Sequence, residues 1–488
     1  MWQIPKVFLV DLAYAVPLRE ALQAADYTYD AVVETLGAEG HAALSRNETT
    51  PGERATRGGS PRETLTRLFL LQLAVPASQA DAALPGLVDR LCAAGLLTRS
   101  VGEVAARVDV RPYATEHDDL WVSSDLTPGL DGAAHRMAAD HVLGISSASS
   151  TLAALTVREQ VSSALDLGTG CGVQALHLAE HVDRVVATDV NARALWLTRL
   201  NAVLNDVDLD VREGDFFAPV RGERFDLITT NPPFVISPAT GERLVYRDSG
   251  LPGDRVVEHV VRHAIDHLVE GGIAQVLGNW MVLRDRPWEE RLGAWVVEAD
   301  AWVVQRELVD LPTYVELWLK DAGLHGTAEY TRRYDTWLSW FDDQGAEAVG
   351  FGWLNLRRTA SPPRIRCEDW PYEVQLPLGE EVAAHFGRLD LLDTDLAGLR
   401  LVRAPDVVQE TLGLPGAEDP QRIVLRRQTG VRRARPVDTG EAALVGACDG
   451  DLTIGQILAA LEELVGPADR MPAVRELVAD GFLTATAR

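Results

Sequence analysis

The sequence predicts an α/β fold built on a mostly parallel sheet that helices cover on both faces. Between residues 161 and 320, short apolar runs rich in β-branched residues alternate with longer segments of helical hydrophobic periodicity. The chain has 488 residues, which exceeds the size of one typical hydrophobic core. We therefore expect this α/β domain to be accompanied by other domains.

Seven apolar runs are the predicted strands of this sheet. They cover residues 163–168, 184–190, 209–214, 225–230, 272–278, 301–308 and 313–319. Residues 191–205 and 254–270 are examples of the helical segments between them. Only the short turn 309–312 separates the last two runs, so we expect those two to form an antiparallel pair at one edge.

The α/β domain is assigned to residues 135–325, and the flanking sequence predicts four further regions. Residues 61–115 show helices followed by strands at 101–114, the order found in a small winged helix. Because no basic recognition helix is visible, packing against another domain is favoured over nucleic-acid binding. The complete set of flanking regions is a helical region (1–60), a winged-helix-like domain (61–115), a β-rich extension (326–436) and a second winged-helix-like region (437–488).

The charge composition argues against a protein that coats nucleic acid with its whole surface. The formal net charge is −26, and phosphate neutralisation dominates such binding. Two arginine clusters remain as local candidates, although arginines paired with carboxylates are the favoured interpretation. The clusters are Arg357, Arg358, Arg364 and Arg366, and Arg422, Arg426, Arg427, Arg432, Arg433 and Arg435.

Cysteine and apolar patterns point to a reduced, non-membrane compartment. The four cysteines form no CxxC pair, so neither a disulfide framework nor a thiolate zinc site is indicated. No apolar run approaches the roughly 20 residues of a membrane span, and the first residues lack a secretory core. We expect a cytoplasmic protein without membrane partners, and the strong preference for arginine over lysine hints at a bacterial source.

Three histidines, His259, His263 and His267, are spaced four residues apart in a predicted helix. This spacing can place three imidazoles on one helical face for a metal, but no carboxylate partner follows. A solvated helix face is the favoured interpretation, and no metal is predicted.

A glycine turn follows the first predicted strand in LDLGTGCG, residues 165–172. Gly168, Gly170 and Gly172 are two residues apart, which is not the GxGxxG spacing of a dinucleotide pyrophosphate site. Such a turn suits a nucleoside with an amino-acid tail and no phosphate, as in S-adenosylmethionine. Asp166 can then bind the ammonium of the tail, directly or through water.

Two further strand ends carry an acid next to an apolar residue. Asp189, followed by Val190, ends the second strand, where a carboxylate can accept both ribose hydroxyls. Asp215 and Phe216 follow the third strand and can accept the adenine amine and stack on its ring. Alternatively, Asp189 caps the helix that begins near residue 191, and Asp215 is an ordinary loop acid.

The fourth strand ends in Asn231, Pro232, Pro233 and Phe234. The prolines fix φ and remove N–H donors, which leaves carbonyl oxygens at a rigid corner. The carboxamide oxygen of Asn231 and the carbonyl of Pro232 can accept both hydrogens of a planar NH2 group, while Phe234 stacks on the attached π-system. The corner therefore predicts a site for an exocyclic base amine or a glutamine amide.

Taken together, these motifs resemble the class I S-adenosylmethionine-dependent methyltransferases, over about residues 135–320. The NPPF sequence resembles that of the amino-methyltransferases that modify adenine N6, guanine N2 or the glutamine of release factors. The resemblance implies a Rossmann-like, seven-stranded, mostly parallel sheet, flanked by winged-helix-like N-terminal and α+β C-terminal regions, and S-adenosylmethionine as cofactor. It also implies that residues 141–155 close over that cofactor.

The resemblance assigns two sets of site residues. The acceptor-amine, or catalytic, role falls on Asn231, Pro232, Pro233 and Phe234. The cofactor-binding role falls on Asp166, Gly168, Thr169, Gly170, Gly172, Asp189, Val190, Asp215, Phe216 and Asn231.

The leading functional hypothesis is methylation of an exocyclic amine of an RNA base, adenine N6 or guanine N2 in ribosomal or transfer RNA. The resemblance to RNA-base enzymes is favoured by Phe234, because tyrosine is frequent at this position in the glutamine and DNA-adenine branches. Methylation of a protein glutamine, of a small-molecule amine, or a non-catalytic binding module of the same fold remain open. Oligomeric state and the acceptor's identity also remain open.

Overall fold

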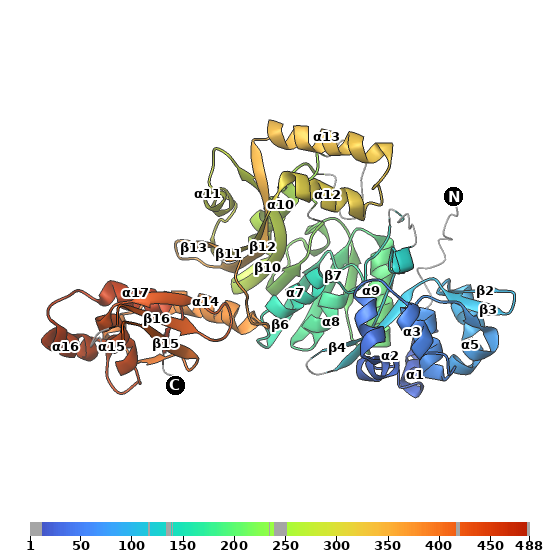
Figure 1. The fold of residues 1–488 in the computed structure, drawn as a ribbon, viewed down its shortest axis with the longest axis horizontal. Helices are drawn as coiled ribbons and strands as arrows, with labels where there is room; N and C mark the ends of the chain where they lie inside the picture. Colours follow the sequence, from blue (N-terminus) through green and yellow to red (C-terminus); the bar gives the residue numbers. More distant parts are fainter. Residues whose placement is uncertain are drawn as a thin grey trace. The chain divides into compact units, whose positions relative to one another are not determined.

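The computed structural model describes residues 12–115, 118–132, 138, 140–233, 235–238, 251–415 and 420–485. The chain divides into two compact units (Figure 1). The first unit contains residues 1–153 and 160–369, and the second contains residues 154–159 and 370–488. No helix among the described residues has the length and apolarity that a membrane span requires.

An eight-stranded sheet forms the centre of the first unit, in the order β13-β11-β12-β10-β9-β6-β7-β8 (Figure 1). Only β12 runs antiparallel to its neighbours, β10 and β11. This confirms the predicted mostly parallel α/β sheet, with one strand more than the seven expected. The strands are β6 (Val161–Leu167), β7 (Val182–Asp189), β8 (Asp210–Glu213), β9 (Phe225–Thr230), β10 (Leu268–Leu283), β11 (Ala299–Asp310), β12 (Ala346–Arg358) and β13 (Ile365–Asp369).

Helices cover both faces of the sheet because its strands are apolar on both sides. On one face Ala164 and Leu227 pack with Leu178 of α8, and on the other Leu165 and Ile228 pack near α10. This alternation follows the two-residue period of a strand. The helices of this domain are α7 (Ser147–Leu155), α8 (Val173–Ala179), α9 (Ala192–Leu204), α10 (Arg255–Ala264), α11 (Trp288–Gly293), α12 (Leu311–Asp321) and α13 (Ala328–Asp343), with 3-10 turns at Ala218–Val220 and Ile265–His267.

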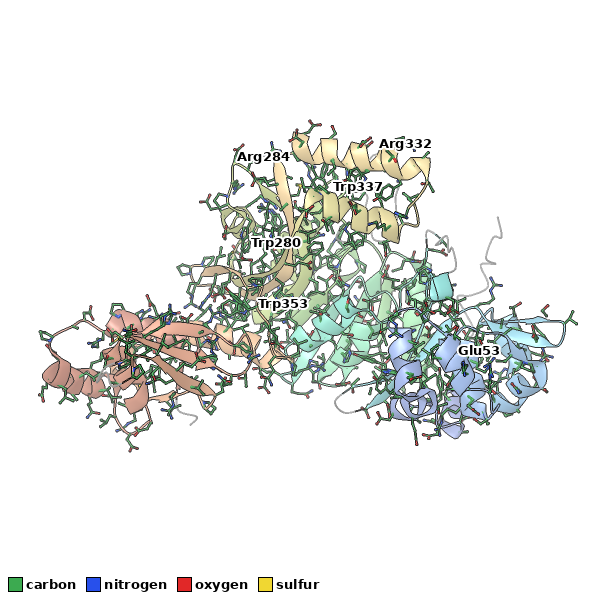
Figure 2. The ribbon with its side chains drawn as sticks, viewed as in Figure 1. Glu53, Trp280, Arg284, Arg332, Trp337 and Trp353 are labelled. Carbon is green, nitrogen blue, oxygen red and sulfur yellow. The ribbon has the colours of Figure 1, made fainter. Side chains whose placement is uncertain are left out.

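The strand predicted at 313–319 is wrong, because this segment lies in helix α12. The Asp310 side chain caps the helix by accepting the N–H of Thr313 at 2.8 Å, and Pro312 occupies the first turn. Tyr314, Val315, Trp318 and Leu319 are buried, a one-sided pattern that fits a helix. The buried Trp337 of α13 belongs to the same cluster (Figure 2).

The antiparallel partner of β11 is instead β12, which the sequence had placed in a separate β-rich extension. In that predicted extension, β12 and β13 both pair with β11, one on each side of it. Trp353 of β12 and Trp280 of β10 are buried in this part of the sheet (Figure 2). The sheet of the first unit therefore continues past residue 325 as far as Asp369.

The N-terminal region consists of short helices and two small sheets. The run 101–114, expected to be one strand pair, contributes to both: β3 pairs with β2 and β1, and β4 pairs with β5. The winged-helix description of 61–115 stays a prediction. The elements are α1 (Ala15–Ala24), α2 (Tyr29–Leu44), α3 (Thr50–Ala55), α4 (Pro61–Leu65), π-turn η2 (Thr66–Leu70), β1 (Val75–Pro76), α5 (Ala77–Ala83), α6 (Val88–Ala93), β2 (Leu97–Ser100), β3 (Glu103–Ala106), β4 (Asp109–Ala114), β5 (Asp119–Ser124) and a 3-10 turn at Leu130–Gly132.

One hydrophobic core joins the N-terminal region to the central domain. Leu18 of α1 and Trp121 of β5 belong to the same buried cluster as Cys171, Leu197 and Leu200 of the central domain. Elements α1 to β5 of the N-terminal region therefore share a core with α8 and α9.

The second unit has its own core, which includes Leu401, Leu444, Val474 and Phe482. A three-stranded sheet, β15-β16-β17, and a two-stranded sheet, β14-β18, accompany its helices. The elements are α14 (Gly379–Leu392), a 3-10 turn (Leu396–Gly398), β14 (Leu401–Arg403), β15 (Val407–Leu412), β16 (Arg422–Arg427), β17 (Ala434–Val437), α15 (Thr439–Ala447), α16 (Ile454–Val465), α17 (Met471–Ala479) and β18 (Leu483–Ala485).

Candidate functional site

The sequence-predicted site residues follow the carboxyl ends of four adjacent parallel strands, β9, β6, β7 and β8. Leu167 of β6 pairs with Thr188 of β7 and with Thr230 of β9, and Asp189 pairs with Glu213 of β8. The hydroxyl of Thr230 donates to the carbonyl of Leu167 at 2.7 Å and ties the central two strands together. The glycine turn and Asn231 therefore start side by side, where ligands bind in open α/β sheets.

The glycine turn is held open by its backbone conformation. Gly168, Gly170 and Gly172 have φ of 74°, 58° and 86°, values that favour glycine. A Cβ on Gly168 or Gly170 would meet nothing within 4 Å, whereas one on Gly172 would meet Thr198 at 3.0 Å. The first two glycines thus border open space, and the third is required for packing against α9.

Asp166 lies beneath the turn and is 2% exposed. Its Oδ2 accepts hydrogen bonds from the Thr169 hydroxyl at 2.6 Å and from the N–H of Ala175 at 3.1 Å. Burial raises the pKa of this carboxyl to about 7, and the nearby Asp189 charge acts in the same direction. Asp166 therefore ties the glycine turn to the start of helix α8, and a nearby cation would favour its ionised form.

Asp189 connects the end of β7 to the glycine turn. Its two carboxylate oxygens accept the N–H groups of Gly170 at 3.0 Å and of Asn191 at 2.8 Å. Burial raises the pKa of Asp189. The cap of α9 is Asn191, whose side chain accepts from Arg193, so Asp189 is not the capping residue. Val190 beside it is 60% exposed and offers an apolar surface.

The turn after β8 contains an exposed Asp215 and a half-buried Phe216. The N–H of Gly214 donates to the Asp189 carbonyl at 3.0 Å, which fixes this turn beside β7. Phe216 has φ of 44°, a costly conformation for a bulky side chain. Its ring lies 4.4 Å from the His259 ring of α10. Burial, aided by His263, lowers the pKa of His259, so this imidazole favours its neutral form.

At the end of β9, Asn231 is half-buried and its Oδ1 is buried. This oxygen accepts no hydrogen bond from any residue in the described ranges. Pro232 is buried and Pro233 is exposed. Phe234, the ring expected to stack on the acceptor, lies outside the described residues.

Tyr314 of α12 anchors the segment that follows this corner, and sequence reasoning missed it. Its hydroxyl accepts the N–H of Ile236 at 2.8 Å and contacts Nδ2 of the buried Asn279 at 3.1 Å. Val235 and Ile236 pack with Tyr314 in one buried cluster. The helix signal at Asp310 and Pro312 was available in the sequence, but the segment had been interpreted as a strand.

The segment 141–155, expected to close over the cofactor, is fixed to α9 and α8. Val142 donates its N–H to Asp125 at 2.8 Å, and Asp125 also pairs with Arg193. The Gln174 side chain donates to the carbonyl of Ser149 at 2.6 Å. The closure of residues 141–155 over a cofactor stays a prediction. Most of the loop 244–255, which follows the NPPF corner in the sequence, lies outside the described residues.

The histidine row serves separate contacts rather than a shared ligand. His263 bonds to the carbonyl of His259 at 2.8 Å, and His267 stacks on Phe217 and bonds to the carbonyl of Glu223 at 3.0 Å. Within the described ranges, no group of three or more His, Cys, Asp or Glu side chains is placed to hold a metal ion.

The arginine clusters are largely paired with carboxylates. In the first cluster, Arg357 and Arg364 bind the fully buried Asp300 at 2.8 and 3.3 Å. In the second, the pairs are Arg426 with Glu410, Arg427 with Asp406, Arg432 with Glu373, Arg433 with Asp480, and Arg435 with Glu476.

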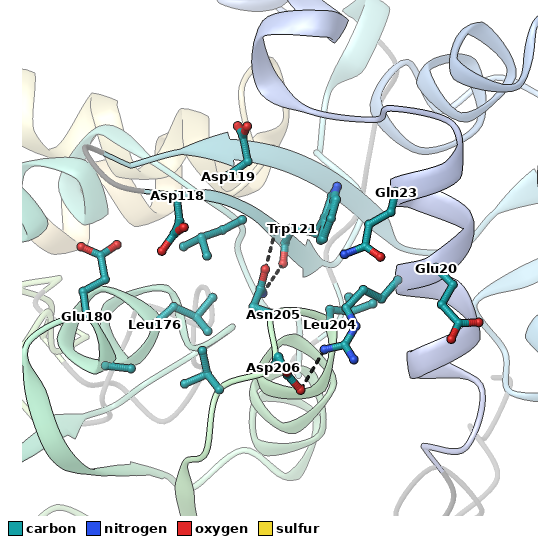
Figure 3. Close-up of a pocket in the computed structure, with 14 residues that line it drawn as sticks. Glu20, Gln23, Asp118, Asp119, Trp121, Leu176, Glu180, Leu204, Asn205 and Asp206 are labelled. Atoms are coloured by element: carbon teal, nitrogen blue, oxygen red, sulfur yellow. Dashed lines mark hydrogen bonds and ion pairs between the residues drawn. The ribbon is translucent and has the colours of Figure 1, made fainter.

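A cavity of about 540 Å³ lies elsewhere, where α1, α8, α9 and β5 meet (Figure 3). None of the sequence-predicted site residues lines it. Arg19 in its wall pairs with Asp206 at 3.0 Å. Its other charged lining residues are acidic: Glu20, Asp118, Asp119 and Glu180.

Two family models match parts of the chain. Residues 24–107 match a domain of unknown function (DUF7059). Residues 144–293 match the methyltransferase small domain.

Curated relatives share this second region. The chain is 31% identical over 166 residues to the ribosomal protein uL3 glutamine methyltransferase of Bradyrhizobium diazoefficiens, covering 30% of this chain and 52% of the relative. It is 33% identical over 117 residues to the ribosomal RNA small subunit methyltransferase C of Salmonella arizonae, covering 24% and 30%. It is 37% identical over 134 residues to the release factor glutamine methyltransferase of Aquifex aeolicus, covering 25% and 47%. The chain thus spans about half, or less, of the length of these relatives.

Solved structures with matching segments include a T. thermophilus 16S rRNA N2 methyltransferase in complex with AdoMet and guanosine. It is 18% identical, with a TM-score of 0.27, over 47% of this chain and 60% of that chain. A putative class I S-adenosylmethionine-dependent methyltransferase from Listeria monocytogenes is 13% identical, with a TM-score of 0.26, over 46% and 63%.

The sheet order is that of a Rossmann-like, mostly parallel α/β domain, as the sequence predicted. Residues 144–293 of this domain match the methyltransferase small domain, and the relatives that share this region include glutamine and ribosomal RNA methyltransferases.

Proposed function

We propose that the protein is an S-adenosylmethionine-dependent N-methyltransferase whose acceptor is an exocyclic amine of an RNA base, adenine N6 or guanine N2 in ribosomal or transfer RNA. The observation that supports this most directly is the buried Oδ1 of Asn231 beside the glycine turn, which has no hydrogen-bond partner among the described residues. A buried polar atom without a partner costs about 1–3 kcal/mol. An N–H group of the acceptor would remove that cost.

The strand-end residues fit S-adenosylmethionine. The open space at Gly168 and Gly170 admits a ligand close to the backbone. The carboxylate of Asp189 accepts backbone N–H groups and retains capacity for ribose hydroxyls. The exposed Val190 offers a surface for the adenine ring, and Asp166 a charge for the ammonium. When bound, S-adenosylmethionine supplies a methyl group that is already strongly electrophilic.

The chain's own contribution is to orient the acceptor. Asn231 Oδ1 and the Pro232 carbonyl accept the two hydrogens of the planar amine, which directs the nitrogen lone pair out of the amine plane. Such alignment can lower the activation free energy of methyl transfer by about 7–11 kcal/mol. Because a substituted nitrogen loses its proton readily to water, no general base is required before attack.

A second acceptor, a protein glutamine amide, has the same planar geometry. The charge favours it, because the chain has 72 acidic and 46 basic residues. Ion pairing of the two arginine clusters also reduces the surface available for phosphates. Both acceptors fit the cytoplasmic location that the sequence predicts.

Methyl transfer to cellular fractions distinguishes these candidates. The purified protein is incubated with tritiated S-adenosylmethionine and either RNA or protein from cells that lack the gene, and mass spectrometry locates the methyl group. Labelled RNA is the expected result, and label only in protein would favour the glutamine. Cofactor binding without label in either fraction would indicate a small-molecule acceptor. Absence of cofactor binding in calorimetry would indicate a non-catalytic module and refute the proposal.

A further inference from the structure

Helix α9 binds strand β5 through two asparagines one helical turn apart. Asn201 accepts the N–H of Ser123 at 2.7 Å and donates to its carbonyl at 2.8 Å. Asn205 does the same with the N–H and carbonyl of Trp121, both at 2.8 Å (Figure 3). A carboxamide offers one acceptor and one donor face, as a peptide group does. Each asparagine side chain therefore makes the pair of hydrogen bonds that one residue of a neighbouring strand would make with β5.

The spacing of these contacts is geometrically matched. Four helical residues rise about 6 Å. Two strand residues span about 6.6–6.8 Å. Residues 201 and 205 of the helix therefore meet residues 123 and 121 of the strand in register. Farther toward the start of α9, Arg193 pairs with Asp125, two residues beyond Ser123.

The same helix binds the glycine turn through its neighbouring face. Asn201 uses its second amide hydrogen to donate to the carbonyl of Cys171 at 2.7 Å. The hydroxyl of Thr198 donates to the carbonyl of Gly170 at 3.0 Å. Asn201 and Thr198 are both fully buried. Asn205, by contrast, donates to the carbonyls of Trp121 and Asn201.

We propose that Asn201 is a positioning residue for cofactor binding, and that it makes strand β5 of the N-terminal region part of the support of the cofactor site. A carbonyl shares its peptide plane with the next N–H. Fixing the carbonyls of Gly170 and Cys171 therefore directs the N–H groups of Cys171 and Gly172. Glycine-rich turns have many accessible conformations, so such anchors reduce the ordering required on binding. The inference rests on the proposed function, because the ligand of the turn is the methyl donor.

The test compares Asn201→Ala with Asn205→Ala in the full-length protein. Both substitutions remove two hydrogen bonds to β5, but only the first also releases the carbonyl of Cys171. We expect Asn201→Ala to weaken S-adenosylmethionine and S-adenosylhomocysteine binding about tenfold in calorimetry, the equivalent of one hydrogen bond. Asn205→Ala should change the Kd less than twofold at a comparable loss of Tm. At saturating cofactor, both variants should keep a kcat near that of the wild type.

Thr198→Val provides a second measurement that leaves the contacts with β5 in place, because it only replaces the hydroxyl that binds the Gly170 carbonyl with a methyl group. Thr198→Val should also raise the Kd for S-adenosylmethionine. If Asn201→Ala fails to fold, this variant alone tests whether anchoring of the glycine turn by α9 supports cofactor binding. Equal cofactor affinity in the wild type and Thr198→Val, or equal weakening by both asparagine variants, would overturn the inference alone. Failure of the wild type to bind either ligand would instead overturn the proposed function on which it depends.

Discussion

Asn231 is the residue whose surroundings say most about the chemistry. Its side chain follows β9 at the point where β9 and β6 lie side by side, and its oxygen is buried without a donor among the described residues. A purely structural asparagine would be expected to satisfy that oxygen within the protein. The proposed role, acceptance of an N–H group from the substrate, would satisfy this oxygen.

Replacing this side chain should separate catalysis from cofactor binding. In Asn231→Ala we expect kcat to fall by at least about a hundredfold, as when one oriented hydrogen-bonding group is lost from an active site. The Kd for S-adenosylmethionine should stay within a few-fold of the wild type. Steady-state kinetics and calorimetry give the two values, with Asn205→Ala as the control. A near-normal rate in Asn231→Ala would contradict the assigned role.

The buried carboxyl of Asp166 predicts a pH dependence. Its pKa of about 7 lies above the ordinary value near 3.9. Its neutral form is favoured in the unliganded fold, so its contribution to stability is present below about pH 4 and is lost as pH rises through 7. A ligand ammonium favours the ionised form. We therefore expect weaker binding of S-adenosylmethionine at pH 6, with a Kd up to about tenfold higher than at pH 8.

Asp166→Asn is the control for this effect, because an amide does not titrate. Calorimetry of both proteins over the same pH range cancels the titration of the ligand's own amino group. If the two proteins show the same pH profile, the carboxyl does not contact the ammonium.

At the scale of elements, helix α12 positions the corner after β9. The Tyr314 hydroxyl holds Ile236 and Asn279, so Tyr314→Phe leaves the Ile236 N–H without its acceptor. We expect kcat to fall about tenfold or more, with unchanged cofactor affinity, because the displaced segment orients the acceptor. Tyr330→Phe removes the same hydroxyl from the neighbouring helix α13 and should have little effect. A Tyr314→Phe rate equal to that of Tyr330→Phe would exclude this role.

Local patterns in the sequence were sufficient for the strands that form the site, but not for every element around them. Asp166, Asp189 and Asn231 each follow an apolar run directly, so their positions at strand ends could be predicted. The helix α12 was misassigned because its apolar residues outweighed the capping signal at Asp310. Strand β12 pairs with β10 and β11, but helices α12 and α13 separate it from both strands in the sequence. No local feature therefore assigned β12 to the sheet.

Contacts between distant residues could not be predicted from local patterns. Asn201 meets Ser123 across 78 positions, and Ile236 meets Tyr314 across the same separation. Likewise, Phe216, which has a positive φ, packs against His259 of a later helix. These roles arise from tertiary packing, which a single sequence does not reveal.

At the scale of the whole molecule, the first unit should unfold as one body, because its N-terminal region and central domain share a core. Leu18 of α1 is fully buried in that core, so Leu18→Ala should lower the free energy of unfolding by about 2–5 kcal/mol. Hydrogen exchange should show reduced protection in β6 and α9 as well as in α1. The matched variant Leu444→Ala, in the core of the second unit, should leave that protection unchanged. Loss confined to α1 would show that the two regions open separately.

The hairpin of α12 and α13 leaves the sheet at Asp310 and returns to it at Ala346, into the strand next to the one it left. Because both chain ends of this excursion lie on adjacent antiparallel strands, its length is not dictated by any crossing over the sheet. An insert attached in this way can be exchanged for a shorter or longer one without breaking the pairing of β11 with β12.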